Sequence, residues 1–195
     1  VTLLVTHSLR LMRSWTALRA MSTSTVPRLN IVLIHPDIPG NTGCVGRTAL
    51  ATGCRLHLIH PMGFDLSDKS VRRAGLDYWP KVDVREHACW DSFVETEFPS
   101  AAVRPAPWLF TTHASDSPLW DGCYRHGDYL LFGSETRGAP AHVHEWVSNW
   151  GKGHRVTLPM QPDARSINLA ASVGAAVYEA KRQLAHELAA TGTAT

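Results

Sequence analysis

The chain has 195 residues and a mass of 21.5 kDa, a size that fits one ordinary domain and leaves little room for two separate cores. Its composition, 44% hydrophobic and 18% charged, is that of a globular protein. No apolar run approaches the roughly 20 residues of a membrane-spanning helix. The formal net charge of +2 is too small to indicate nucleic-acid binding by itself. The four cysteines lie far apart without a C-x-x-C pair, which argues against a zinc site or disulfide framework and suits a reducing compartment.

The first 28 residues have the composition of a transit peptide. Four arginines occur there among many Ser and Thr residues, and no acidic residue precedes Asp37. A disordered tail, or upstream sequence before a start at Met12 or Met21, would have the same composition. We therefore treat 1–28 as an extension and 29–190 as the folded domain. We expect an intracellular, soluble protein, in the chloroplast or mitochondrion if the extension directs import and otherwise in the cytoplasm.

From Leu29 onward, short buried runs alternate with longer helical ones. The apolar patterns predict strands over 29–35, 55–60, 82–85, 108–112, 129–132 and 155–158. They predict helices over 43–53, 67–76 and 91–98, from about 140, and from 166 to about 189. A polar loop, 36–42, precedes the first helix. Strands that are nearly unbroken apolar runs, alternating with helices, indicate an α/β fold with a mostly parallel sheet covered on both faces.

Three polar clusters follow predicted strands, at the sheet edge where open α/β folds place ligands. The first is Asn41-Thr42-Gly43 with Arg47 after it. Either Asn41 or Thr42 can cap the helix, which would leave Arg47 on its first turns and aimed at the same crevice. A capping loop beside an unrelated surface arginine is the simpler alternative.

The second cluster, 133–138, reads G-S-E-T-R-G directly after a strand. Its two glycines permit backbone shapes and close ligand approach that other residues would resist. Glu135 and Arg137 bring opposite charges to one turn, and a purely structural ion pair between them is the alternative to a ligand site.

The third cluster runs from Leu158-Pro159-Met160 to Arg165-Ser166-Ile167-Asn168, with Ser166 as the predicted helix cap. The cation Arg165 would oppose the positive end of that helix unless an anion lay nearby. Because guanidinium groups grip phosphate oxygens in pairs, we interpret Arg47, Arg137 and Arg165 as a phosphate-binding set.

Two other kinds of site are disfavoured. Gly40, Gly43 and Gly46 follow a strand but are spaced G-x-x-G-x-x-G, and no carboxylate ends the second strand, so an NAD enzyme is not indicated. The eleven histidines show no ligand spacing, since His142 and His144 would face different sides of a helix. We expect no metal.

With all three clusters in view, the chain resembles the SPOUT class of RNA methyltransferases, and within it the small tRNA (cytidine/uridine-34)-2′-O-methyltransferases. The resemblance spans Leu29 to Gln183 and is carried by four segments: LNIVLIHPDIPGNTGCVGR, LHLIHPMGFDLSDKSVRRAGLDYW, DYLLFGSETRGAP and LPMQPDARSINLAASVGAAVYEAKRQ. It implies a C-terminal deep trefoil knot that chain rules alone would not predict. It also implies the cofactor S-adenosylmethionine, the tRNA anticodon loop as substrate, and a homodimer with the site at the subunit interface.

The resemblance also implies roles for individual residues. Arg47 takes the position of the catalytic residue. The implied cofactor-binding residues are Phe110, Thr111, Thr112, Gly133, Glu135, Leu158, Met160, Ser166 and Asn168. The implied RNA-binding residues are Asn41, Arg137, Arg165 and Tyr178, to which we add a basic group of Lys69, Arg72 and Arg73 that could equally be a solvated helix face.

The closing helix has a thin first half, rich in Ala, Gly and Ser from Ala170 to Ala176, which permits close approach of another backbone. Ordinary core packing explains this equally well, whereas the resemblance assigns it to self-association. Three positions depart from the usual pattern, namely Gly40, Ala139 and Ile167, and none removes a polar group of the site. The alternatives that stay open are the same reaction on rRNA or on another tRNA position, and an RNA-binding protein of the same fold without transferase activity.

Overall fold

The computed structural model describes residues 28–66, 78–100, 105–113 and 116–190. The predicted helix 67–76, the basic group Lys69, Arg72 and Arg73, and nearly all of the N-terminal extension lie outside these residues. No helix in the described part is long and apolar enough to cross a membrane. All four cysteines are free thiols.

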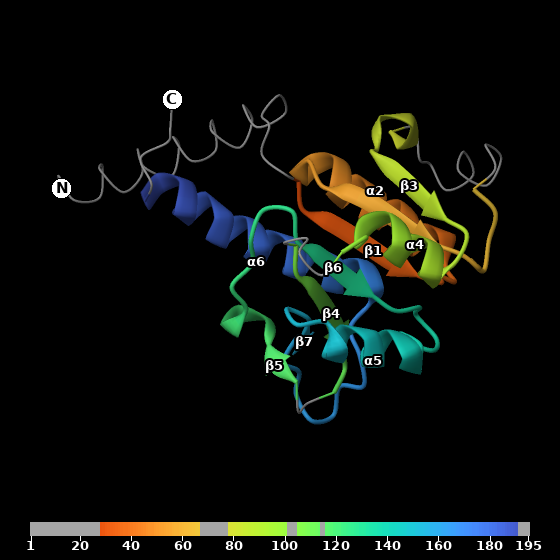
Figure 1. The fold of residues 1–195 in the computed structure, drawn as a ribbon. Helices are drawn as coiled ribbons and strands as arrows, with labels where there is room; N and C mark the ends of the chain where they lie inside the picture. Colours follow the sequence, from red (N-terminus) through yellow and green to blue (C-terminus); the bar gives the residue numbers. More distant parts are fainter. Residues whose placement is uncertain (1–27, 67–77, 101–104, 114–115, 191–195) are drawn as a thin grey trace.

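Seven parallel strands form one sheet in the order β3-β2-β1-β6-β4-β7-β5 (Figure 1). The strands are β1 (Asn30–Ile34), β2 (Arg55–Ile59), β3 (Val84–His87), β4 (Pro107–Thr111), β5 (Ser117–Pro118), β6 (Tyr129–Phe132) and β7 (His154–Thr157). All pairings are parallel. The predicted parallel α/β sheet is confirmed. Its strands differ from the predicted bounds by up to two residues, and the two-residue β5 was not predicted.

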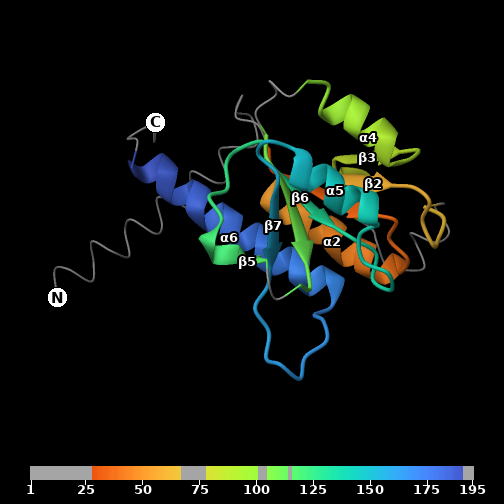
Figure 2. The same cartoon turned by 60° about the horizontal axis from the view of Figure 1, so that its bottom comes forward.

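Helices cover both faces of the sheet, as Figure 2 shows. Helix α2 (Pro39–Thr52) and helix α6 (Leu169–Ala190) contribute Val45, Val173 and Val177 to the apolar core on one face. Helix α4 (Trp90–Glu97) and helix α5 (Ala141–Asn149) contribute Phe93 and Val147 to the core on the other. Two short 3-10 helices, η2 (Trp79–Lys81) and η3 (Leu119–Asp121), complete the order.

The central strands are buried from end to end because both sheet faces are covered. All five residues of β1 and all four of β6 are buried, and Ile31, Leu33 and Leu131 have no exposed surface. Continuous apolar runs such as YLLF are what a doubly covered parallel strand requires. These two strands therefore form a rigid centre from which the loops at the strand ends project.

Candidate functional site

The carboxyl ends of three neighbouring strands, β6, β4 and β7, meet at one edge of the sheet. Phe110 of β4 pairs with Phe132 of β6, and Thr111 pairs with Thr157 of β7. The register therefore brings the residues just beyond these ends, Thr112, Gly133 and Leu158, to one edge. The rings of Phe110 and Phe132 stack with their centroids 4.7 Å apart, so the ends of β4 and β6 also pack together through their side chains. Five of the expected cofactor positions are thus brought together, and half-buried Met160 lies two residues beyond Leu158.

The loop after β6 needs both of its glycines. A Cβ atom at Gly133 would lie 2.0 Å from the backbone nitrogen of Ala139, closer than any real contact. Gly138 has φ +68°, in the left-handed region that favours glycine. Ser134 and Gly138 close the loop by exchanging backbone hydrogen bonds of 3.1 and 2.9 Å. The predicted special backbone shape is confirmed at Gly138. At Gly133 the space that a side chain would need is filled by the backbone of the same loop, and the close approach of a ligand stays a prediction.

A chain of hydrogen bonds joins this loop to the first turn of α2 and to the start of α6. The backbone N–H of Asp37 donates to Glu135 Oε2 at 2.8 Å, and Asn41 Nδ2 donates to Glu135 Oε1 at 2.9 Å. Asn168 Nδ2 in turn donates to Asn41 Oδ1 at 3.0 Å. Both Glu135 carboxylate oxygens thus accept hydrogen bonds from the protein, so its role in this structure is to hold the site together. We call Glu135, Asn41 and Asn168 the amide chain.

Two predicted helix caps are wrong, and residues of the amide chain show why. Helix α2 begins at Pro39, with Ile38 at the cap position and no side-chain cap, so Asn41 and Thr42 lie inside its first turn. Proline suits a first helical turn, where its missing N–H costs nothing, and the helix therefore starts before the predicted 43. Helix α6 is capped by Asn168, whose Oδ1 accepts from the backbone N–H groups of Ala170 and Ala171 at 2.9 and 3.3 Å. Ser166 lies outside the helix.

The alternative of a purely structural ion pair between Glu135 and Arg137 is not what the structure shows. Arg137 contacts Asp37 rather than Glu135, with Nη2 3.5 Å from Asp37 Oδ1, and its side chain is 73% exposed. Thr136 donates a hydrogen bond to the other oxygen of Asp37. That hydrogen bond, with the Arg137 charge, lowers the pKa of Asp37. The loop therefore holds a stable carboxylate at its rim, and Asp37 is a site residue that the sequence analysis missed.

The charged form of the histidine two residues before this carboxylate is disfavoured. Burial, followed by the Arg137 charge, lowers the pKa of His35. His35 has φ +53°, a left-handed conformation unusual outside glycine, and its backbone N–H donates to Ile59 O at 3.0 Å. The positive φ turns the chain sharply at the end of β1 and directs the 36–38 segment towards Glu135.

The three arginines of the expected phosphate-binding set are all at the surface. Arg47 is exposed on α2, and Arg165 is exposed in the 158–168 segment, which loops out at the bottom of Figure 2. Arg47 and Asn41 project from α2 about 120° apart, since successive residues turn by about 100°. Asn41 faces Glu135, whereas the Arg47 guanidinium lies over the ring of Tyr78, 4.6 Å from its centroid. The two side chains therefore do not point into one crevice as predicted.

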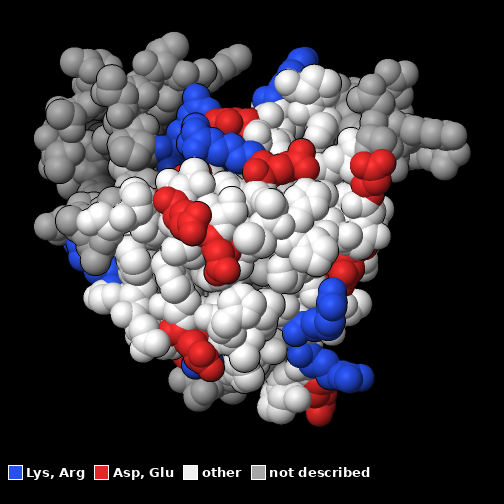
Figure 3. Space-filling view, turned by 45° about the vertical axis from the view of Figure 1, so that its right-hand side comes forward, with Lys and Arg blue, Asp and Glu red and all other residues white. Residues whose placement is uncertain are grey.

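Positive charge is not spread as one continuous stripe on the face drawn in Figure 3. Lys and Arg gather near the top and at the lower right of that view, with Asp and Glu beside each group. Tyr178, the fourth residue expected to contact RNA, is 59% exposed on α6. On this face, contacts to a polyanion would thus depend on particular arginines rather than on a broad basic surface.

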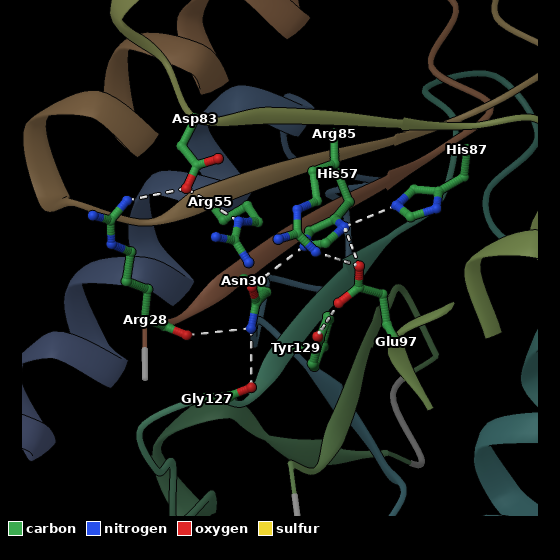
Figure 4. Close-up of polar contacts among 10 residues, drawn as sticks. All are labelled: Arg28, Asn30, Arg55, His57, Asp83, Arg85, His87, Glu97, Gly127 and Tyr129. Atoms are coloured by element: carbon green, nitrogen blue, oxygen red, sulfur yellow. Dashed lines mark hydrogen bonds and ion pairs between the residues drawn. The ribbon is translucent and has the colours of Figure 1, made fainter. Parts of the chain in front are cut away.

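A second polar cluster lies away from this edge, between β2, β3 and α4 (Figure 4). His57 Nδ1 lies 2.9 Å from His87 Nε2 and 3.9 Å from Glu97 Oε1, and these groups have the mutual spacing of metal ligands. Arg85 donates to Glu97 Oε1 at 2.9 Å and Tyr129 donates to Glu97 Oε2 at 2.6 Å. All the candidate ligand atoms are thus engaged with one another or with protein donors, so the cluster is a hydrogen-bonded network. Its members come from separate elements, and no sequence spacing could have revealed it.

Asn30 determines the proton position on His57. Asn30 Nδ2 donates to the backbone oxygens of Arg28 and Gly127, at 3.2 and 3.0 Å, so its Oδ1 must face His57 Nε2, 3.3 Å away. His57 therefore carries its proton on Nε2 and accepts at Nδ1. Burial lowers the pKa of His57 to about 3, and burial likewise lowers the pKa of His87.

A cavity of about 1290 Å³ opens at the opposite edge, at the amino ends of the strands. Its wall includes Arg55, Asp83, Trp108 and Asp128. Arg55 is paired with Asp83 at 3.1 Å, and Asp128 accepts from Trp108 Nε1 at 2.8 Å. These wall groups are thus engaged within the protein, and the predicted ligand residues lie at the other edge.

Comparison with known proteins identifies the family. The model of the SpoU rRNA methylase family matches residues 28–178. A tRNA (cytidine(34)-2'-O)-methyltransferase of Polaromonas sp. is 46% identical over 79% of this chain and 90% of that protein. The Escherichia coli K12 protein of the same name is 43% identical over 81% of this chain and 95% of its own. A solved structure described as giving structural insights into 2-OH methylation of C/U34 on tRNA is 42% identical, covers 82% of this chain and 98% of that chain, and superposes with a TM-score of 0.71. The chain therefore belongs to the SpoU rRNA methylase family.

Proposed function

We propose that this protein transfers a methyl group from S-adenosylmethionine to the 2′ oxygen of the wobble nucleotide, cytidine or uridine 34, of tRNA. The observation that carries the proposal is the 46% identity to a protein named for that reaction, over 90% of that protein's length. The structural neighbour concerned with C/U34 methylation supports the same substrate.

The residues at the carboxyl edge fit a nucleoside cofactor. Thr112, Gly133 and Leu158 directly follow three adjacent strands, and strand ends offer backbone N–H and C=O groups to a ligand. Ser166 and Asn168 lie on the segment that closes this edge, and Asn168 is held by Asn41. When bound, S-adenosylmethionine supplies a methyl group on a sulfonium, a good leaving group, so the main task of the protein is to place the two reactants.

Arg47 is the proposed catalytic residue. A ribose hydroxyl is a poor nucleophile whose proton must leave as attack proceeds, but a guanidinium stays protonated and cannot accept it. We assign Arg47 to clamping the neighbouring phosphate and stabilising the negative charge that develops on the 2′ oxygen. A phosphate oxygen or water accepts the proton. The exposed position of Arg47 suits a group that meets its substrate at the surface.

A C-terminal knot and a homodimer complete the proposal. In support of the knot, β7 is inserted in the sheet between β4 and β5, two strands that are consecutive in the chain. In support of the dimer, Tyr178 and Ile167 are 59% and 41% exposed, and a Cβ atom at Gly174 would meet nothing within 4 Å. A second copy on α6 would cover these residues and could bring Arg47 of one subunit to the cofactor edge of the other. This arrangement would resolve the separation of Arg47 from the amide chain.

The test is methylation of defined RNA. Purified protein, labelled S-adenosylmethionine and unmodified tRNA transcripts should give methyl incorporation that maps to the 2′ oxygen of nucleotide 34, with Arg47→Ala as a control whose transfer rate should be strongly reduced but still measurable. Incorporation into rRNA fragments, or at another tRNA position, would contradict the substrate assignment; the family's description as rRNA methylases makes rRNA the necessary comparison. Binding of tRNA with no transfer to any RNA would favour the non-catalytic alternative.

A further inference from the structure

Arg47 has a partner that the sequence analysis did not consider. Its guanidinium carbon lies 4.6 Å from the centroid of the Tyr78 ring, well inside the range of a cation–π interaction. Within the described parts of the chain, Arg47 forms no ion pair that would hold its side chain. The aromatic face is therefore the group that orients this cation.

Tyr78 is itself fixed to the helix that carries Arg47. Its hydroxyl donates a hydrogen bond of 2.6 Å to the backbone oxygen of Gly43. Gly43 lies four residues before Arg47 in α2, so its carbonyl belongs to the turn from which Arg47 projects. One tyrosine thus spans a single helical turn, with its hydroxyl at one end and its ring beneath the guanidinium at the other.

The segment after Tyr78 is packed closely against the same helix. A Cβ atom at Gly46 would lie 2.6 Å from Trp79 Cζ3, so Gly46 leaves the space that the Trp79 indole occupies. The turn is closed by backbone hydrogen bonds from Lys81 to Tyr78 O and from Val82 to Trp79 O, at 2.9 and 3.0 Å. The segment that carries Tyr78 is therefore fixed against α2, and a residue that positions another side chain must itself be fixed in this way.

We propose that Tyr78 is the positioning residue for Arg47, holding the guanidinium ready for the ribose and phosphate of the substrate. An unrestrained arginine loses much rotamer freedom when it engages a ligand. The ring of Tyr78 already restricts the Arg47 rotamers before the RNA binds, so less rotamer freedom is lost on binding. Unlike a carboxylate partner, the ring does not neutralise the positive charge of Arg47. The catalytic consequence rests on the proposed function, whereas the orientation of Arg47 does not.

Two substitutions separate the ring from the hydroxyl. Tyr78→Phe keeps the aromatic face and removes the bond to Gly43, whereas Tyr78→Leu keeps an apolar side chain and removes the face. We expect Tyr78→Phe to retain most of the transfer rate and Tyr78→Leu to lower kcat by about three- to tenfold, with unchanged affinity for S-adenosylmethionine. Tyr124→Phe is the matched control, because it also removes a hydroxyl bonded to a backbone oxygen, that of Leu119 at 2.8 Å.

The coupling to Arg47 is measured in a double-mutant cycle. If Tyr78 acts through Arg47, Tyr78→Leu should have no further effect on kcat in an Arg47→Ala background. An equal loss in both backgrounds, or full activity of folded Tyr78→Leu, would overturn the proposal.

A spectroscopic measurement tests the orientation without any activity. Protons above an aromatic face resonate upfield, so the Arg47 side-chain signals of the whole protein should be shifted upfield in the wild type and Tyr78→Phe, and should return to ordinary values in Tyr78→Leu. Arg47 signals that do not differ among the three proteins would refute the contact. A wild type that methylates no tRNA but shows these shifts would overturn the proposed function while upholding the orientation of Arg47 by Tyr78.

Discussion

Asn168 and Asn41 are joined by a hydrogen bond of 3.0 Å between side-chain amides that lie 127 positions apart in the sequence. The direction of this bond is determined, because Asn168 Oδ1 already accepts from two backbone N–H groups of α6 and Asn41 Nδ2 already donates to Glu135. Each amide therefore has its donor and acceptor sides assigned. The first turns of α2 and α6 are locked together through groups that cannot be exchanged singly.

The hydrogen bond from Asn41 to Glu135 can be reversed by exchanging the amide and the carboxylate. Changing only one of the two residues should destabilise the protein, and changing both should restore stability. In Glu135→Gln the new amide NH₂ group faces another donor, either Asn41 Nδ2 or the Asp37 N–H. In Asn41→Asp the new carboxylate faces the carboxylate of Glu135. We expect each single change to lower the free energy of unfolding by about 1–3 kcal/mol. In the double variant the new amide at position 135 would donate to the new carboxylate at position 41 and still accept from the Asp37 N–H. That carboxylate would also still accept from Asn168.

Urea unfolding of the four proteins measures this coupling, with Glu86→Gln as an exposed control expected to change stability by less than about 0.5 kcal/mol. Recovery of at least half the loss in the double variant is the expected outcome. Additive losses would show that the amide chain does not have the assigned directions.

Two glycine substitutions distinguish close approach from ordinary flexibility. Gly133→Ala would place a Cβ atom 2.0 Å from the Ala139 backbone nitrogen, and backbone cannot move aside as a side chain can. We expect loss of S-adenosylmethionine binding and a destabilisation of more than about 3 kcal/mol. Gly40→Ala, where a Cβ atom meets nothing within 4 Å in the first turn of α2, should leave stability unchanged or raise it by up to about 1 kcal/mol. Thermal melts and calorimetric titration with the cofactor would decide, and a Gly133→Ala protein that binds normally would contradict the tight packing.

The buried histidines predict a loss of stability in mild acid. Burial lowers the pKa of His57 to about 3 and also lowers that of His87. The unfolded chain therefore binds more protons between its ordinary histidine pKa, about 6.5, and the lowered values. Stability should be complete above about pH 6.5 and should fall as the pH is lowered, by at most about 1.4 kcal/mol per unit for each histidine.

Urea unfolding between pH 7 and 5 tests this dependence in a range above the ordinary pKa of carboxylates. His57→Gln should be less stable at pH 7 but should lose less stability on acidification than the wild type. His60→Gln, which removes an exposed imidazole 2.9 Å from Glu86, is the comparison variant. Equal slopes in all three proteins would be evidence against a neutral buried pair.

Local patterns predicted the elements whose identity is decided locally. The apolar YLLF run predicts β6 at its observed bounds, and the glycines after it predict a loop of special backbone geometry, which Gly138 shows. These features depend on residues within a few positions of one another. Side-chain chemistry alone was sufficient there.

Where a tertiary partner decides, the sequence was ambiguous. Ser166 and Asn168 are both good helix caps, and only the contact of Asn168 with Asn41 favours the second. Asn41 looked like a cap because its partner Glu135 lies 94 positions away. Tyr78 could not be paired with Arg47, nor His57 with His87 and Glu97, because no periodicity relates side chains on different elements. Contacts of this kind are the part of the site that only the fold reveals.

The planar fork of Arg47 should be needed for the reaction. Lysine keeps the positive charge but cannot grip two phosphate oxygens in one plane or stack over the Tyr78 ring in the same way. We expect Arg47→Lys to lower kcat by at least about tenfold without changing the binding of S-adenosylmethionine. Single-turnover methylation of tRNA, with cofactor affinity measured in parallel, would show this. Near-normal turnover would mean that charge alone is sufficient.

The proposed dimer predicts opposite effects of two substitutions at Gly174 on α6. A Cβ atom there meets nothing within 4 Å in one subunit, so Gly174→Ala should stabilise the folded chain by up to about 1 kcal/mol through helix propensity. Gly174→Leu should be equally well folded as a monomer but should block close approach of a second helix. Sedimentation analysis should then find the wild type and Gly174→Ala as dimers and Gly174→Leu as a monomer, with methyl transfer lost together with the dimer. Because Arg47 lies apart from the amide chain within one subunit, an active monomeric Gly174→Leu would require that a single subunit complete the site, which would contradict the shared arrangement.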